Sequence, residues 1–223
     1  MKVVVVVYPG TNCEYDTKYA YEMLSQDVEL LWHKEEKLPV DTDLVVLPGG
    51  FSYGDALRSG SIAKFSPIMK AVIEYANSGG KVLGICNGFQ ILLESGLLPG
   101  AMKHNQNMHF ISKHHHLKVK ENDNDFLKKL NKGSIVNIPI AHGEGNYYID
   151  NDSLNELYKN RQVLLTYCDK EGNELNPNGS IDAIAGICNK NKNVFGLMPH
   201  PERAMETLLG SDDGIKMLEG FIG

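Results

Sequence analysis

Several features are scarce in this sequence, and each scarcity argues against a class of protein. No stretch approaches the roughly 18 uninterrupted apolar residues that a membrane helix needs. The apolar run at residues 3–7 is ended by Tyr8-Pro9-Gly10, too early for a signal peptide. The formal net charge of -6 offers no basic surface for nucleic acid or an anionic membrane. We therefore expect a soluble, cytoplasmic protein with no nucleic acid and no membrane among its partners.

Cysteine is also sparse. The chain has four cysteines and no Cys-x-x-Cys pair: Cys13, Cys86, Cys168 and Cys188. This spacing argues against a zinc site and against a dense disulfide framework. We expect free thiols and no bound metal.

What the chain does contain is enough apolar sequence for one sizeable core. Hydrophobic residues make up 42% and charged residues 22% of its 223 residues, as in ordinary globular proteins. This length suits one larger α/β domain and is short for two. No repeat or linker divides the chain, so we expect a single domain over residues 1–223.

Short apolar runs without polar alternation predict parallel strands that are buried on both faces. They occur at residues 3–7, 44–47, 81–85 and 194–198. Helical spacing at residues 17–24 and 62–77 separates the first three runs. This alternation predicts an α/β fold.

The pattern changes after Gly96. Residues 110–120 and 134–140 look like strands joined by polar turns, while the Asn-rich pieces at 121–125 and 172–179 look like surface loops. The predicted fold is therefore an open, mostly parallel central sheet with helices on both faces and an added antiparallel β excursion.

The clearest local signal is Gly84-Ile85-Cys86-Asn87-Gly88, which joins a predicted strand to an apolar helix. Glycines two before and two after a nucleophile relieve crowding in the tight turn of a nucleophile elbow. The Cys86 thiol would then stand above the sheet, near unpaired helix N–H groups that favour thiolate. We interpret Cys86 as a nucleophile; the alternative is a small buried hydrophobic residue.

Cys13 is a rival nucleophile, because Pro9-Gly10-Thr11-Asn12-Cys13 also follows a strand and precedes a helical segment. It lacks the Gly-x-Cys-x-Gly frame. Ligand sites in open α/β sheets gather at the carboxyl ends of strands, so Cys13 could line the same crevice. We favour a packing role for it.

A thiolate nucleophile needs a histidine that protonates the leaving amine and a group that orients the histidine. His200-Pro201-Glu202 follows the predicted strand at residues 194–198. Pro201 favours an extended backbone at His200, which would project His200 and Glu202 to the same side. We expect this pair beside Cys86; the alternative is an ordinary surface loop.

A Gly-Gly pair at the end of another predicted strand completes the candidate site. The backbone N–H of Gly50, together with that of Asn87 just after the nucleophile, could form an oxyanion hole. The alternative for the glycine pair is a simple turn.

These residues and several further blocks resemble the glutamine amidotransferase subunits of phosphoribosylformylglycinamidine synthase, within the class I, triad-type amidotransferases. The class-level motif is Gly84-Ile-Cys86-Asn-Gly88-Phe-Gln90 with His200-Pro-Glu202. The subfamily blocks are residues 9–13 (PGTNC), 47–55 (LPGGFSYGD), 140–145 (IAHGEG), 176–180 (NPNGS), 184–188 (IAGIC) and 198–203 (MPHPER).

The resemblance implies a flavodoxin-like fold and a glutaminase in purine biosynthesis. Glutamine would supply ammonia to an ATP-dependent synthetase subunit that converts formylglycinamide ribonucleotide to formylglycinamidine ribonucleotide. A small third subunit is also implied. No cofactor is expected in this chain, whereas ATP and magnesium would be used by the partner. The lack of a Gly-x-x-x-x-Gly-Lys-[Ser/Thr] loop agrees with this division.

The resemblance also implies glutamine-binding residues: Gln90, Asn107, Met108, His109 and Phe110. His142 belongs to a block that resembles a family block near the active site. Its chemistry gives no specific role, and a structural, hydrogen-bonded histidine is an equal alternative.

The segment Lys113-His114-His115-His116 departs from the family, whose members usually carry more apolar or aromatic residues here. On a strand, at most His114 and His116 could share an ion, because alternate side chains point to opposite faces. We favour a solvated strand face.

Three other functions stay open at this stage. A standalone cysteine amide hydrolase would turn over without a partner, and an amidotransferase subunit of another synthetase would associate with that synthetase. A non-catalytic binding module would not react with glutamine-like electrophiles.

Overall fold

The structure is a computed structural model that describes residues 1–222. Its strands are β1 (Lys2–Val7), β2 (Asp27–Trp32), β3 (Leu44–Leu47), β4 (Lys81–Ile85), β5 (Ala101–Lys103), β6 (Ile111–Val119), β7 (Ile135–His142), β8 (Asn146–Tyr148), β9 (Val163–Cys168), β10 (Ile184–Cys188) and β11 (Val194–Leu197). Its α-helices are α1 (Glu14–Met23), α2 (Pro67–Asn77), α3 (Asn87–Glu94), α4 (Asn151–Lys159) and α5 (Gly214–Leu218).

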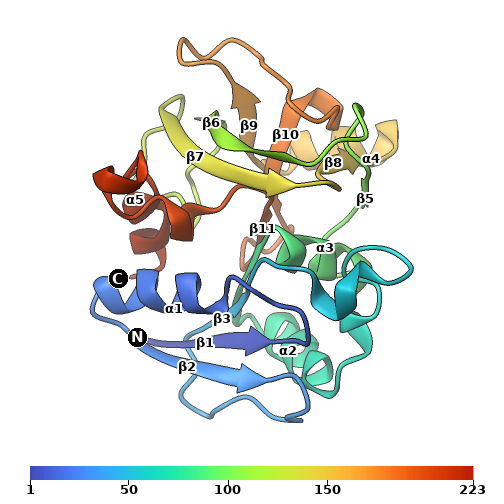
Figure 1. Cartoon of the computed structure of the whole chain (residues 1–223), viewed down its shortest axis with the longest axis vertical. Helices are drawn as coiled ribbons and strands as arrows, with labels where there is room; N and C mark the ends of the chain where they lie inside the picture. Colours follow the sequence, from blue (N-terminus) through green and yellow to red (C-terminus); the bar gives the residue numbers. More distant parts are fainter. Residues whose placement is uncertain (223) are drawn as a thin grey trace.

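One nine-stranded sheet runs through the molecule in the order β2-β1-β3-β4-β11-β10-β9-β6-β7 (Figure 1). The pairs from β2 to β11 are parallel, and the pairs from β11 to β7 are antiparallel. The predicted parallel sheet with an antiparallel excursion is confirmed. A separate two-stranded antiparallel sheet joins β5 to β8.

Helices cover the parallel strands from both sides. In Figure 1, α1 and α5 lie to one side of these strands, whereas α2 and α3 lie to the other. Chain direction explains this arrangement. The sheet grows one way from β1 to β2 and the opposite way from β3 to β4, and right-handed crossovers then put α1 and α2 on opposite faces. Both faces of β1 and β3 are therefore buried, as the unbroken apolar runs predicted.

The helix predicted at residues 62–77 is wrong in its first turns. Residues Ala63–Phe65 form a 3₁₀ turn, Ser66 is extended with ψ 141°, and the α-helix begins at Pro67. The residue before a proline is pushed out of the helical region, while proline itself suits the first helical position. The same rule that was applied to His200 would have placed this break.

Several elements were not predicted. Strand β2 lies at the edge of the sheet and is only partly buried, so its pattern is weak. Strands β9 and β10 are short apolar runs within the antiparallel region. Helix α4 starts at an Asp150 cap, whose carboxylate accepts a hydrogen bond from the Ser153 N–H at 2.9 Å.

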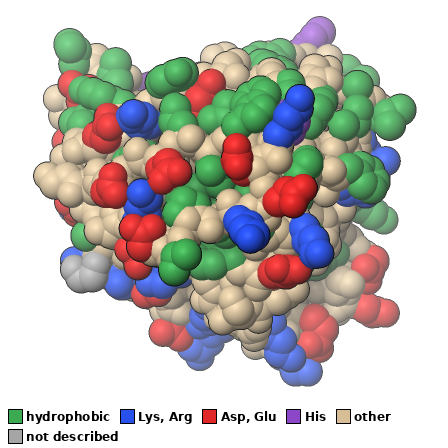
Figure 2. Space-filling view, turned by 90° about the horizontal axis from the view of Figure 1, so that it is seen from below, with side chains coloured by type: hydrophobic (Ala, Val, Ile, Leu, Met, Phe, Trp, Pro, Cys, Tyr) green, Lys and Arg blue, Asp and Glu red, His purple; other side chains and the backbone are tan. Residues whose placement is uncertain are grey.

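The surface carries charges of both signs. In the view of Figure 2, basic and acidic side chains alternate without a large field of one sign. Lys2 pairs with Glu29 and Lys81 with Asp125, each at 2.8 Å. Within residues 1–222, no helix combines the length and the apolar character that crossing a membrane requires.

Candidate active site

Cys86 occupies a strained turn between β4 and α3. Its backbone has φ 50° and ψ -106°, a conformation that residues with a side chain rarely adopt. The flanking glycines are required by close approach. A Cβ on Gly84 would lie 2.7 Å from the Gly88 carbonyl, and one on Gly88 would overlap the Leu47 carbonyl. The predicted elbow geometry is present.

His200 and Glu202 form a buried pair just after β11. Their side chains are 2% and 0% exposed, and Nδ1 lies 2.7 Å from Oε1 of the carboxylate. Because a carboxylate accepts, Nδ1 donates, which leaves Nε2 free of the pair. Nε2 is buried without a partner among the described residues. The extended backbone that was expected here is wrong, because Pro201–Arg203 is a 3₁₀ turn. This turn brings the Glu202 carboxylate back to the His200 ring.

The surroundings of His200 favour its charged form. Burial lowers the pKa of the imidazole, but the Glu202 carboxylate and the Cys86 and Cys13 thiol groups act more strongly together. The net effect raises the pKa of His200 well above its usual value. The ring can therefore hold a proton for a leaving group while Glu202 fixes its tautomer.

Two adjoining cavities meet at Cys86. The first, of about 240 Å³, is lined by Cys13, Cys86, His200 and Arg203 among others. The second, of about 180 Å³, extends toward Gln90 and Glu144. Gly50, Phe51, Cys86, Phe110 and Ala141 line both. The nucleophile candidate thus has one space beside the imidazole and another that leads away from it.

Both predicted oxyanion donors lie beside Cys86. Asn87 is the first residue of α3, where the backbone N–H has no partner inside the helix. Gly50 lines both cavities and has φ +139°, and a Cβ there would lie 2.6 Å from the Asn12 nitrogen. Only glycine fits this position.

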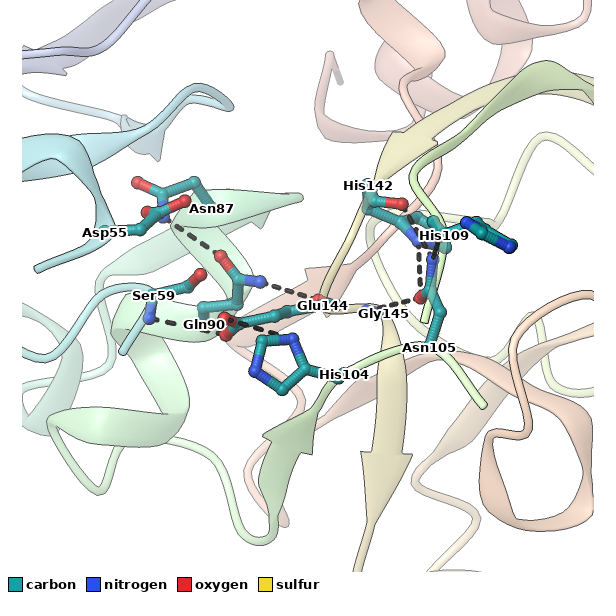
Figure 3. A network of polar contacts seen from close by, with 10 residues as sticks. All are labelled: Asp55, Ser59, Asn87, Gln90, His104, Asn105, His109, His142, Glu144 and Gly145. Atoms are coloured by element: carbon teal, nitrogen blue, oxygen red, sulfur yellow. Dashed lines mark hydrogen bonds and ion pairs between the residues drawn. The ribbon is translucent and has the colours of Figure 1, made fainter. Parts of the chain in front are cut away.

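Gln90 lies in the wall of the smaller cavity. Figure 3 shows it between Asn87 and Glu144. Asn87 Nδ2 donates to Gln90 Oε1 at 3.0 Å, and Gln90 Nε2 donates to the Glu144 carbonyl at 2.7 Å. Both polar ends of Gln90 are therefore engaged, and its side chain connects the elbow helix to the turn after β7.

The other predicted glutamine-binding residues separate into two groups. Phe110 lines both cavities, and its ring lies 6.5 Å from that of Phe51. Asn107, Met108 and His109 are exposed on the preceding turn and are absent from both cavity walls. That turn is closed by the Asn107 side chain, which accepts from the His109 N–H at 3.0 Å.

Cys13 shares the larger cavity with His200, as its position after β1 allowed. The thiol is 2% exposed and accepts a hydrogen bond from Arg203 Nη2 at 3.0 Å. Burial raises the pKa of Cys13; nearby His200 and Arg203 oppose this and Glu202 adds to it. Burial thus favours the protonated thiol at Cys13.

Sequence reasoning assigned no roles to Asp55, Ser59, Asn105 and Glu144. Asp55 and Glu144 line the smaller cavity, and the Ser59 N–H donates to Glu144 Oε2 at 3.4 Å. Asn105 Nδ2 donates to the carbonyls of His109 and His142, each at 2.8 Å. Two of the four, Asp55 and Glu144, stood inside blocks typical of the family. That was the available signal.

The histidine run is divided between the two faces of β6. His115 is 4% exposed, and its Nε2 lies 2.8 Å from the Leu175 carbonyl. His114 is exposed, because neighbours on a strand face opposite sides. Within residues 1–222, the group of three possible metal ligands is Cys13, His200 and Glu202 instead. Two of those three already bond to each other.

Comparisons with known proteins show the family of this chain. The family profile of the CobB/CobQ-like glutamine amidotransferase domain matches residues 1–213. Phosphoribosylformylglycinamidine synthase subunit PurQ of Sulfurimonas denitrificans is 70% identical over 100% of this chain and 99% of its own. The subunit of the same name from Campylobacter jejuni is 59% identical over 100% and 96%.

Solved structures give the same picture. A chain in the structure of PurLQS from Thermotoga maritima has a TM-score of 0.89 and 42% identity, covering 99% of this chain and 97% of its own. A second glutamine amidotransferase from T. maritima has a TM-score of 0.59 at 15% identity, covering 100% and 90%. The latter supports the fold alone.

Proposed function

Because the chain belongs to the PurQ family of CobB/CobQ-like glutamine amidotransferases, we propose that it is the glutaminase subunit of phosphoribosylformylglycinamidine synthase. It hydrolyses glutamine to glutamate and ammonia. A synthetase subunit then uses the ammonia to convert formylglycinamide ribonucleotide to formylglycinamidine ribonucleotide. The observation that carries this proposal is the strained Cys86 elbow opening into one cavity with the buried His200–Glu202 pair.

In the first half of the reaction, the Cys86 sulfur attacks the side-chain carbonyl carbon of glutamine. Negative charge moves to the carbonyl oxygen, where the N–H groups of Gly50 and Asn87 stabilise it. The carbon–nitrogen bond then breaks, and the proton on His200 goes to the departing nitrogen. Ammonia leaves and a γ-glutamyl thioester remains on Cys86.

In the second half, His200 takes a proton from water as the water oxygen attacks the thioester. The carbon–sulfur bond breaks, glutamate leaves, and the thiol and imidazole return to their starting states. Glu202 bonds to Nδ1 of His200, so Nε2 is the nitrogen that exchanges protons. The Phe51 and Phe110 rings line the same cavity.

The partners follow from the division of chemistry. The related T. maritima chain was solved as part of PurLQS. We propose that this chain likewise assembles with an ATP-dependent synthetase subunit and a small third subunit. ATP and magnesium are used in the synthetase, because this chain lacks the Gly-x-x-x-x-Gly-Lys-[Ser/Thr] loop. We place the reaction in the cytoplasm, where the four free thiols would stay reduced.

The test is glutamate release from glutamine by the wild type, Cys86→Ala and Cys13→Ala. Each is assayed alone and with synthetase subunits, ATP and formylglycinamide ribonucleotide. We expect release to rise on assembly, to vanish in Cys86→Ala and to persist in Cys13→Ala, the matched thiol control. Full activity in Cys86→Ala would refute the nucleophile. Equal turnover with and without the synthetase would favour a standalone amide hydrolase.

A further inference from the structure

Two carboxylates from distant parts of the chain face the smaller cavity. Asp55 comes from the loop after β3, and Glu144 from the turn after β7. Figure 3 shows both in the network around Gln90. Asn87 Nδ2 reaches Asp55 Oδ1 only at 3.4 Å, a long hydrogen bond. The cavity volume of about 180 Å³ equals roughly six water molecules, so its occupant is a small molecule.

This cavity carries more negative than positive charge. None of the described residues that line it is a lysine or an arginine. His104 Nδ1 lies 3.6 Å from Glu144 Oε1, but the His104 side chain is 64% exposed. Burial, with a further contribution from Glu144, raises the pKa of Asp55 to about 6, although Ser59 opposes this. A cationic group on a ligand would offset part of this negative charge.

His142, in the same wall, has a ring nitrogen without a hydrogen-bond donor among the described residues. Asn105 Nδ2 donates to two carbonyls, so its Oδ1 is an acceptor, and it receives the Gly145 N–H at 3.0 Å. His142 Nδ1, 3.0 Å from that oxygen, must therefore carry a proton. Burial, together with nearby His200 and His115, lowers the pKa of His142 to about 4, so its Nε2 holds a bare lone pair. Nε2 is buried and unpartnered among the described residues.

We propose that Asp55 and Glu144 bind the α-ammonium group of glutamine, and that this contact selects an α-amino acid over other primary amides. The inference rests on the proposed glutaminase function, since Cys86 at the junction of the cavities must receive the carboxamide end. Glutamine carries its single positive charge at the opposite end of the molecule. Placing the carboxamide at Cys86 directs that charge into the acidic cavity.

The sharpest test compares L-glutamine with glutaramate, the same amide with hydrogen in place of the ammonium group. Both are assayed on the assembled enzyme, with wild type, Asp55→Asn, Glu144→Gln and the control Asp152→Asn on exposed α4. Asp55 has φ 54°, a region that asparagine tolerates, so Asp55→Asn should fold.

A charged hydrogen bond of this kind changes affinity by about 10- to 100-fold. We expect Asp55→Asn and Glu144→Gln each to lower kcat/KM for L-glutamine by about that factor, mainly through KM. Their kcat/KM for glutaramate should equal that of the wild type within about twofold. Asp152→Asn should match the wild type on both substrates.

The pH dependence gives a second readout. The titratable groups facing Asp55 and lining its cavity are Glu144, His104, His142 and Cys86. His104, His142 and Cys86 act on both substrates, whereas the charge on Asp55, like that on Glu144, acts on the ammonium group. The ratio of KM for glutaramate to KM for L-glutamine should therefore fall as pH drops through about 6. This fall should be absent in Asp55→Asn.

Equal decreases in kcat/KM for L-glutamine and glutaramate in Asp55→Asn and Glu144→Gln would overturn the inference. The carboxylates would then only maintain the structure around Cys86. A pH-independent KM ratio in the wild type would overturn it as well. Failure of the proposed function looks different: Cys86→Ala would then retain glutaminase activity whatever the carboxylate variants do. Calorimetric binding of L-glutamine, but not glutaramate, to assembled Cys86→Ala would support the inference without catalysis.

Discussion

The five parallel strands and the four antiparallel strands of the sheet contribute different parts of the site. Gly50, Cys86 and His200 all follow parallel strands, namely β3, β4 and β11. The carboxyl ends of neighbouring parallel strands meet at one edge, so the loops that follow them converge. Antiparallel strands alternate in direction, and the β7 end supplies Ala141, His142 and Glu144 to the cavity wall.

This difference separates the chemistry from the selection of substrate. The groups proposed to make and break bonds are held by the parallel half, where strained backbone and close-packed glycines fix their positions. The two carboxylates proposed to recognise glutamine come from different halves, since Asp55 follows β3 and Glu144 follows β7. Four variants can break or sharpen this comparison.

The largest effect is expected in the parallel half, at Glu202. Replacing it in Glu202→Gln removes the charge that raises the pKa of His200 and holds its Nδ1 proton. By analogy with the carboxylate-to-amide change in a serine triad, kcat should fall by about 10⁴-fold with little change in KM. The measurement is steady-state glutamate release by the assembled enzyme. Glu206→Gln, which keeps an oxygen to accept the hydrogen bond from the Tyr19 hydroxyl, is the control and should stay near wild type.

The next effect is on folding. Gly88→Ala puts a methyl group into the Leu47 carbonyl and should lower the free energy of unfolding by about 3 kcal/mol. In Gly143→Ala, beside the antiparallel half, the added Cβ lies 3.7 Å from its nearest neighbour, the Phe110 ring. This variant should change the free energy of unfolding by less than about 0.5 kcal/mol. Urea denaturation measures both. Equal stability of the two variants would contradict the account of the elbow.

A smaller effect should appear in the acid stability of the antiparallel half. The folded pKa of His142 is about 4, below its usual 6.5, so as pH falls the unfolded chain binds this proton first. The free energy of unfolding therefore decreases as pH falls from 6.5 to 4, by on the order of 3 kcal/mol at most. Urea unfolding of His142→Gln across this pH range should show a smaller decrease in the free energy of unfolding than the wild type. The same pH dependence in both proteins would refute a buried, neutral His142.

The smallest effect is expected on the exposed face of β6. The double variant His114→Ala, His116→Ala should change the free energy of unfolding by less than about 0.5 kcal/mol. Neither side chain is buried, and the contact of His114 with the Leu209 carbonyl lies at the surface. Zinc titration should show the same affinity for variant and wild type. Tight, stoichiometric zinc binding that is lost in the variant would show that this strand is a metal site.

Features governed by near neighbours could be predicted from the sequence. The elbow frame around Cys86 and the pairing of His200 with Glu202 depend on spacings of two residues. Even there, the path between His200 and Glu202 is a 3₁₀ turn and not an extended segment. Apolar runs separated by helical segments likewise predicted four of the five parallel strands. They missed the edge strand β2, and they missed β9 and β10, whose place is set by pairing with each other and with distant strands.

The order of apolar runs, glycines and prolines was thus sufficient for the α/β class and for the tight turn at Cys86, because steric limits on a strand-to-helix turn act within a few residues. The tertiary structure alone decided that Asp55 and Glu144 share a cavity and that Asn105 fixes the tautomer of His142. It also decided that Arg203 meets Cys13. Such contacts join residues far apart in the chain, and they exist only once strand order and crossover direction have brought those segments to one edge of the sheet.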